Sequence, residues 1–159
     1  MKKLKVYLDT SVISHLFADD AKVRMDDTIL FWEMVKADKY EVFLSDTVTM
    51  ELGRCKEPKL SKVFGKIKEI KCEILTATQE VRDLAQLYID RGVLEEDSYD
   101  DCMHIAFAVI EKCDVIVSWN FRHLVNYDTI DGVKRVNAIK NYPEMRIMSP
   151  NMFLGERAL

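Results

Sequence analysis

Acidic and amide side chains of this sequence follow short apolar runs, a placement that could assemble a site for a divalent cation. Asp9 comes directly after the first apolar run, Glu51 lies in a short helix expected after the second, and Asn120 comes shortly after the fourth. Loops at the carboxyl ends of parallel strands converge on one edge of a sheet, and ligands bind in the crevice there. These three side chains are therefore expected to meet at that edge.

A fourth candidate, Asp101, lies in the first turns of a helix that leads into the fourth run, so topology alone does not bring it to the same edge. Each acid also has a simpler interpretation. Asp9 begins the stretch Asp9-Thr10-Ser11 of good N-cap residues, and Ser98 with Asp101 fits a capping box before an apolar run. Glu51 lies on the apolar face of its helix, where a buried carboxylate requires a partner, either a metal ion or a nearby lysine.

One metal site would account for all of these acids, whereas the simpler interpretations must each hold separately. Carboxylate oxygens suit hard cations such as Mg²⁺ or Mn²⁺, which bind substrate phosphates through water. Zinc is not expected, because His15, His104 and His123 lie far apart in the sequence and no Cys/His pair has zinc-finger spacing. The segment Cys102-Met103-His104 is interpreted as part of a helix, with its cysteine and histidine in the core or on the helix surface.

Short β-rich runs alternate with longer segments of helical period, which predicts βα units around a mainly parallel sheet. The expected strands are 5–8, 42–45, 72–75, 115–118 and 146–148. The expected helices, from apolar residues at helical spacing, lie within 27–36, 60–70, 81–88 and 103–110. Because no repeat, linker or compositional break divides the sequence, residues 1–159 are expected to form one α/β domain.

Composition narrows the class of protein. With 23 Lys and Arg against 27 Asp and Glu, the 159 residues carry a net charge of −4, which excludes a protein that coats nucleic acid or anionic membranes with positive charge. Four cysteines without a C-x-x-C pair are expected to be reduced thiols in a cytoplasmic protein. The apolar run after the basic start is too short for an export signal, and no run is long enough to predict a membrane span.

Four segments of the chain resemble the signatures of the PIN-domain family and occur in the order of that family. They are VYLDTSVI (6–13), LSDTVTMEL (44–52), DCMHIAFA (101–108) and VSWNF (117–121). The segment 148–154 is similar to the closing segment of the family. Each segment alone is a weak signal, whereas four in order with suitable spacing are a fairly specific one.

The resemblance implies a three-layer α/β/α sandwich with a central, mainly parallel sheet. It also implies a Mg²⁺- or Mn²⁺-dependent ribonuclease like the toxins of bacterial and archaeal toxin–antitoxin pairs, with an RNA substrate, an antitoxin from a separate chain, and a homodimer. Water activated by the metal would attack a phosphodiester in line with the leaving oxygen. The alternative is a PIN-like domain without catalysis that serves as a nucleic-acid- or protein-binding module.

Carried over residue by residue, the resemblance makes Asp9, Glu51 and Asp101 the acidic metal-binding positions. Asn120 joins them as a candidate catalytic residue; many members have Asp at this position, so the number of metal ions stays open. Asp100 is the near alternative to Asp101. The supporting residues expected around these acids are Thr10, Ser11, Ser118 and Asp100.

Basic side chains are candidate phosphate contacts. Arg122 and His123 lie just beyond the fourth signature, although an exposed Arg-His pair is also typical of solvated surface. Lys59, Lys62 and Lys66 lie on one side of a predicted helix, which fits an RNA track, a surface for an acidic partner or an ordinary solvated face. The aromatic residues of the fourth signature are interpreted as core or interface side chains rather than base-stacking platforms.

Overall fold

The computed structural model describes residues 2–155; residues 1 and 156–159, which also belong to the predicted domain, lie outside the described part. Five parallel strands form one sheet in the order β3-β2-β1-β4-β5. The strands are β1 (Leu4–Leu8), β2 (Tyr40–Ser45), β3 (Cys72–Leu75), β4 (Val115–Val117) and β5 (Arg146–Met148). They lie where the sequence pattern predicts them, so the predicted parallel sheet is confirmed.

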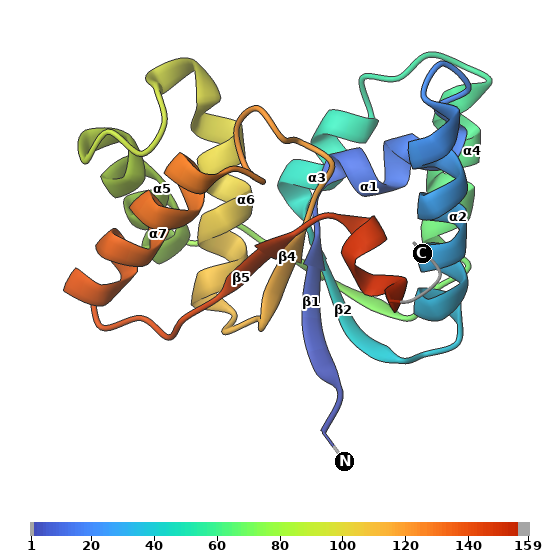
Figure 1. Ribbon diagram of the computed structural model, residues 1–159. Helices are drawn as coiled ribbons and strands as arrows, with labels where there is room; N and C mark the ends of the chain where they lie inside the picture. Colours follow the sequence, from blue (N-terminus) through green and yellow to red (C-terminus); the bar gives the residue numbers. More distant parts are fainter. Residues whose placement is uncertain (1, 156–159) are drawn as a thin grey trace.

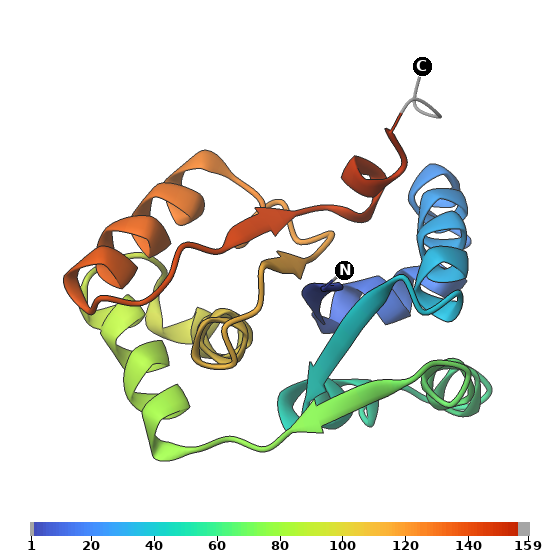
Figure 2. The same ribbon diagram turned by 90° about the horizontal axis from the view of Figure 1, so that it is seen from below.

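Helices cover both faces of this sheet and give the molecule three layers (Figure 1 and Figure 2). The helices on one face are α5 (Gln79–Asp90), α6 (Tyr99–Ile110) and α7 (Tyr127–Ile139). Those on the other are α2 (Lys22–Lys36) and α4 (Lys59–Ile67), with η3 (Pro150–Phe153) packed beside α2. The short helices are α1 (Thr10–Ser14), η1 (His15–Phe17), α3 (Asp46–Leu52) and η2 (Glu96–Ser98). The predicted α/β/α sandwich is confirmed.

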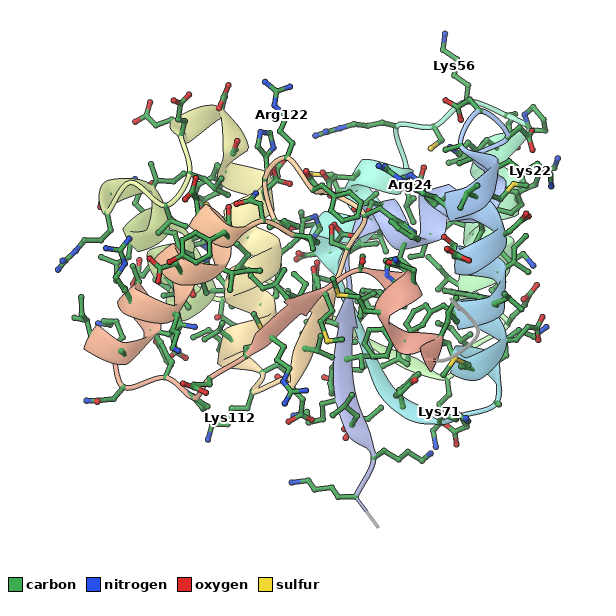
Figure 3. All side chains as sticks on the ribbon, viewed as in Figure 1. Lys22, Arg24, Lys56, Lys71, Lys112 and Arg122 are labelled. Atoms are coloured by element: carbon green, nitrogen blue, oxygen red, sulfur yellow. The ribbon has the colours of Figure 1, made fainter. Side chains whose placement is uncertain are left out.

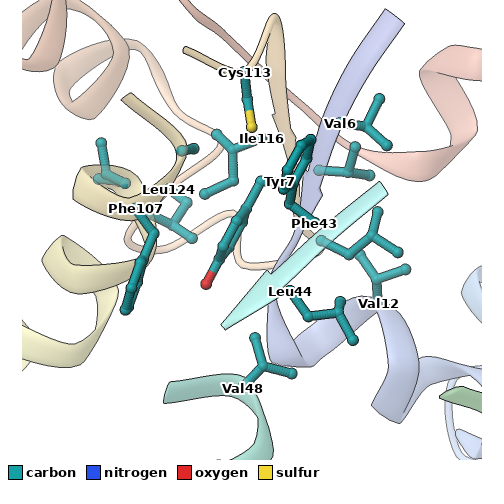
Figure 4. Close-up of a cluster of buried hydrophobic side chains, with 14 of the residues drawn as sticks. Val6, Tyr7, Val12, Phe43, Leu44, Val48, Phe107, Cys113, Ile116 and Leu124 are labelled. Carbon is teal, nitrogen blue, oxygen red and sulfur yellow. The ribbon is translucent and has the colours of Figure 1, made fainter. Parts of the chain in front are cut away.

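Strand β1 forms the middle of the core, because both faces of a covered parallel sheet must be apolar. Its residues Val6, Tyr7 and Leu8 are fully buried, and the strand pairs with β2 on one side and β4 on the other. Figure 4 shows this region, where side chains of β1 and β2 pack near Phe107 of α6. A residue that follows β1 therefore lies at the middle of the carboxyl edge of the sheet.

Helix α7 is absent from the elements predicted by sequence. Its buried residues are Thr129, Gly132, Val133, Val136 and Asn137. Polar and small side chains therefore interrupt the apolar period on the buried side of the helix. Asn137 tolerates burial because its side-chain oxygen accepts a hydrogen bond of 2.6 Å from the hydroxyl of Tyr88. Apolar spacing alone does not reveal such a helix.

The cysteine side chains all carry free thiols: Cys55, Cys72, Cys102 and Cys113. Burial raises the pKa of the Cys102 and Cys113 thiols to about 12, so these two are protonated at neutral pH and unreactive. Among the helices of residues 2–155, none has the length and apolar character needed to cross a membrane.

Candidate active site

Asp9 lies at the middle of the carboxyl edge, between the end of β1 and the start of α1. Its side chain is 4% exposed. Ser11 Oγ donates a hydrogen bond of 2.6 Å to Oδ1, and Ser118 Oγ donates one of 2.5 Å to Oδ2. Asp9 is also the N-cap of α1, because Oδ1 accepts from the N–H of Val12. The predicted cap therefore forms, and two serines, one in α1 and one directly after β4, orient both oxygens of this buried acid.

Glu51 reaches the same edge from α3. The hydroxyl of Thr10 donates to Oε1 at 2.5 Å, and Nε2 of His104 donates to the same oxygen at 2.6 Å. His104 belongs to α6 and is 2% exposed. The partner that this half-buried carboxylate requires is therefore a histidine rather than one of the nearby lysines.

Asp101 joins these acids from the first turn of α6. Nδ1 of His123 lies 2.9 Å from Oδ2 and donates to it, and Nδ2 of Asn120 donates to Oδ1 at 3.4 Å. The alternative capping box does not form, because Ser98, the N-cap of α6, makes no side-chain hydrogen bond to the helix. Within the described residues, the side chain of Asp100 makes no hydrogen bond or ion pair. The structure thus connects Asp101, and not Asp100, to the loop that follows β4.

That loop is held in shape by its own polar groups. Ser118 is fully buried, and its Oγ accepts the N–H of Asn120 at 2.9 Å while it donates to Asp9. The side-chain oxygen of Asn120 accepts the N–H of His123 at 2.9 Å. The amide oxygen of Asn120 therefore braces the loop, and its amide nitrogen faces the carboxylate of Asp101.

Burial and the neighbouring histidine act on the pKa values of the acids in opposite directions. Burial raises the pKa of Asp9 and Asp101, against the lowering effect of His104. Burial also acts to raise the pKa of Glu51, but the hydrogen bonds and charge of its neighbours outweigh burial and lower it overall. Burial acts to lower the pKa of His104, yet the surrounding carboxylates raise it overall. His104 is therefore the group that offsets the negative charge among the three acids.

The donor chemistry of this site fits a hard divalent cation, because Mg²⁺ and Mn²⁺ prefer carboxylate oxygens. Within residues 2–155, no three His, Cys, Asp or Glu side chains lie together as a ready-made metal cage. Such a cage is not required, since Mg²⁺ commonly binds through one or two carboxylates together with water and substrate phosphates. Asp9, Glu51 and Asp101 are the residues that would hold the cation.

Two of the predicted phosphate contacts border the acids. Arg122 and His123 line a cleft of about 1010 Å³ between α7 and the connection from α5 to α6. His123 is tied to Asp101, whereas Arg122 is exposed and points outward (Figure 3). Arg122 and Arg24 lie at the same end of the molecule, beyond the carboxyl ends of the strands.

The predicted lysine track on α4 extends away from the acids. Lys59, at the start of α4, donates a hydrogen bond of 3.0 Å to Ser14 of α1. Lys62 is exposed. Lys66, in the last turn of α4, pairs at 3.4 Å with Glu69, which follows the end of the helix. Only Lys59 is thus connected to the elements that carry the acids.

The two aromatic residues that flank Asn120 pack with an arginine. Phe121 directly follows Asn120 and is 39% exposed, whereas Trp119 is 4% exposed and donates from its ring N–H to Thr28 at 2.7 Å. The guanidinium of Arg24 lies 5.0 Å from the ring centroid of Phe121 and 5.7 Å from that of Trp119. Trp119 therefore belongs to the core, and Phe121 presents part of its ring at the rim of the site.

His104 is the site residue that sequence reasoning misses. Its ring is buried, as the core interpretation expects, but it is bound to a carboxylate of the site. The signal in the sequence is the step of three residues from Asp101 to His104, which places both on one face of a helix. His104 and His123 lie far apart in the sequence, but the fold brings both of them into contact with acids of the site.

Comparison with known proteins agrees with this fold. The sequence model of the PIN domain matches residues 6–124 of the chain. The structure of VapC20 from Mycobacterium tuberculosis, described as a sarcin-ricin loop cleaving toxin, matches with a TM-score of 0.55 at 19% identity, over 70% of this chain and 87% of that chain. VapBC2 from Rickettsia felis, bound to a DNA fragment from its promoter, matches with a TM-score of 0.55 at 11% identity, over 92% of this chain and 98% of that chain. No curated protein matches the sequence.

Proposed function

The chain belongs to the PIN-domain family, and we propose that it is a divalent-metal-dependent endoribonuclease that hydrolyses RNA phosphodiester bonds. The observation that carries the proposal is the convergence of Asp9, Glu51 and Asp101 at one edge of the sheet, each held by hydrogen bonds from neighbouring side chains. Buried carboxylates that lie together are unfavourable unless a positive charge offsets them. A divalent cation supplies that charge and at the same time attracts the phosphate of a substrate.

Each acid has a part in this reaction. Asp9 and Asp101 would hold Mg²⁺ or Mn²⁺, and Glu51 would hold the metal or orient the attacking water. The chemistry that such a metal supplies when bound is a water of lowered pKa and neutralisation of charge on the phosphate. Oε1 of Glu51 is already bonded to Thr10 and His104, so Oε2 is the oxygen that can accept a proton from water.

The rim of the site supports single-stranded RNA as the substrate. Unpaired bases stack on aromatic rings and on arginine planes, whereas the bases of a duplex are not accessible for stacking. Phe121 is partly exposed under the guanidinium of Arg24. Arg122 adds positive charge for the RNA backbone near the acids. The positive charge of these groups is confined to this part of the surface, because the whole chain carries a net charge of −4.

We also propose that the enzyme is the toxin of a type II toxin–antitoxin pair. The support is its structural likeness to a VapC toxin and to VapBC2. An antitoxin protein would then be its partner, and a homodimer and a cytoplasmic location stay predictions from the sequence.

A catalytically inactive binding module is the second candidate, and Asn120 is the observation behind it. The family position often holds an Asp, whereas here the side-chain oxygen of Asn120 is bonded to the N–H of His123. The site therefore has one acid fewer than many relatives. Tight RNA or protein binding by a wild-type protein that cuts no RNA would favour this candidate.

Asp101→Asn and Asp100→Asn form a matched pair that tests the nuclease assignment. We expect Asp101→Asn to lower the rate of Mn²⁺-dependent RNA cleavage by about 10- to 100-fold, because a side chain that would hold the metal loses its charge. Asp100→Asn should cleave like wild type, since Asp100 has no bond to the site. Rates of oligonucleotide cleavage on variants with wild-type melting curves measure this. Equal losses in the two variants, or cleavage that survives EDTA, contradict the assignment.

A further inference from the structure

A buried chain of polar side chains links Glu51 to the middle of the sheet. The hydroxyl of Tyr7 on β1 lies 2.7 Å from Nδ1 of His104 and 2.7 Å from Oγ of Ser45, the last residue of β2. At the other side of the ring, Nε2 of His104 lies 2.6 Å from Oε1 of Glu51. Tyr7 and Ser45 are fully buried and His104 is 2% exposed, so this chain is shielded from water.

The core fixes the inner end of the chain. The ring of Tyr7 stacks on Phe107, with 6.3 Å between centroids and an interplanar angle of 11°. Figure 4 shows the hydroxyl of Tyr7 directed away from Cys113. Ser45 is held in turn, because its Oγ accepts the N–H of Val48 at 3.4 Å. Since β1 and β2 are central, paired strands, the position of the Tyr7 hydroxyl is set by the sheet itself.

The hydrogen bonds define how the ring of His104 must lie. A carboxylate oxygen only accepts, so Nε2 carries the hydrogen that bonds Glu51, and Nδ1 meets a hydroxyl that can donate or accept. Turning the ring by half a rotation would replace both contacts by C–H contacts. Within residues 2–155, no buried side-chain nitrogen or oxygen lacks a partner. A complete, buried network of this kind holds a single arrangement of its members.

We infer that His104 is a positioning residue that orients Glu51 toward a metal ion, with Tyr7 and Ser45 as its support. The inference rests on the proposed function, because Glu51 is one of the acids that would hold the metal. His104 and Thr10 both bond to Oε1, and Oε2 receives no hydrogen bond from the described residues. Oε2 is therefore the oxygen left for the cation or its water. Hydrogen-bond partners of metal-binding side chains typically contribute about 10- to 100-fold in metal affinity.

Titration with Mn²⁺ alone, followed by calorimetry, tests this role without relying on catalysis. His104→Leu, which lacks both ring nitrogens, should weaken Mn²⁺ binding by about 10- to 100-fold. His104→Gln keeps an N–H donor and should bind Mn²⁺ with an affinity between those of wild type and His104→Leu. Tyr7→Phe removes only the hydroxyl and should weaken binding by a smaller factor than His104→Leu does.

Tyr88→Phe is the matched control for Tyr7→Phe. Tyr88 is equally buried, and its hydroxyl donates to Asn137 in another part of the core. A merely structural role for the chain predicts that both variants lower stability and that neither changes the affinity for Mn²⁺. The positioning role predicts weaker Mn²⁺ binding in Tyr7→Phe alone. If His104→Leu fails to fold, Tyr7→Phe and His104→Gln decide, and unchanged or tighter binding in both overturns the inference.

Asp9→Asn separates this inference from the proposed function. If wild type binds Mn²⁺ no more tightly than Asp9→Asn does, the metal site and the positioning role both fall. If wild type binds more tightly than Asp9→Asn, and both Tyr7→Phe and His104→Gln equal wild type, the positioning role alone falls. Long-range ¹H–¹⁵N NMR of the metal-free protein gives a second readout, with a hydrogen on Nε2 of His104 expected. A ring hydrogen on Nδ1 alone contradicts the arrangement.

Discussion

Hydrogen bonds at single residues decide which oxygens of the acidic site are free. Two serines occupy both oxygens of Asp9, and Oε1 of Glu51 is bonded twice. His123 and Asn120 face the carboxylate of Asp101. Metal binding would therefore use the lone pairs that these hydrogen bonds leave free, and the residues that make the hydrogen bonds set which lone pairs those are.

Asn120→Asp should lower stability in EDTA and increase the stabilisation by Mn²⁺. The new carboxylate loses the donor to Asp101 and places a like charge beside it, which destabilises the protein by about 1 kcal/mol or roughly 2–4 °C in Tm. The same charge attracts a cation, so Mn²⁺ should raise Tm more in the variant than in wild type. Thermal melts in EDTA and in Mn²⁺ measure both effects. A variant with the wild-type Tm in EDTA, or a smaller gain with Mn²⁺, would count against the role assigned to Asn120.

At the scale of elements, the start of α7 holds the rim of the site. Asn126 is the N-cap of α7, and its side-chain oxygen accepts the N–H of Thr129 at 2.9 Å. Its amide nitrogen donates to the carbonyls of Phe121 and Arg122, each at 3.0 Å. One side chain therefore caps a helix and fastens the loop that presents an aromatic ring and a basic group beside the acids.

Replacing Asn126 should separate these two roles. Asn126→Ala loses the cap and the loop contacts, and we expect a loss of about 0.5–2 kcal/mol in unfolding free energy. Asn126→Asp keeps an oxygen that caps α7 but loses both donors to the loop, so its stability should lie between those of wild type and Asn126→Ala. Denaturant unfolding measures the free energies, and proteolysis of the native protein in the segment 121–125 reports on the loop. If Asn126→Asp is as unstable as Asn126→Ala, the cap is not the main contribution.

The strands of this protein can be predicted from sequence, whereas α7 and the contact to His104 cannot be read from apolar spacing. Buried strands such as Val6 to Leu8 are short, continuous apolar runs, which are typical of a parallel sheet covered on both faces. The buried side of α7 carries Asn137, whose burial depends on the hydroxyl of Tyr88, a residue far away in the sequence. The bond between His104 and Glu51 likewise joins two helices, so only their packing reveals it. The sequence also allows a capping box at Asp101, and this interpretation is wrong because Ser98 makes no side-chain hydrogen bond to α6.

For the molecule as a whole, the sheet concentrates negative charge at one edge while basic groups lie around it. The net charge of −4 excludes a passive basic coat, but it does not exclude RNA as a substrate. Three of the acids lie in the site, where a bound divalent cation would reverse the local sign. RNA should therefore be repelled from the acids without metal and attracted to them with metal.

Stability without divalent metal should fall as the pH rises above 6.5. The pKa of His104 is raised from its ordinary value of 6.5 in the folded protein, despite burial, because its carboxylate neighbours favour the charged ring. The stabilisation from this group is complete below the unfolded value and is lost as the pH rises through the higher folded value. Thermal melts in EDTA across this range measure the effect, and His104→Gln is the control that lacks it. A wild-type profile parallel to that of His104→Gln contradicts the assignment.

RNA cleavage by wild type and Asp9→Asn, measured side by side with and without Mn²⁺, is the most direct test of the nuclease assignment. Asparagine keeps oxygen and shape at the cap of α1 but removes the charge that would hold the metal, so the variant should fold like wild type. We expect wild type to cut a single-stranded RNA with Mn²⁺ and not in EDTA, and Asp9→Asn to be at least about 100-fold slower with Mn²⁺. Equal rates in the two proteins, or wild-type cleavage that continues in EDTA, would contradict a metal-dependent ribonuclease built on Asp9.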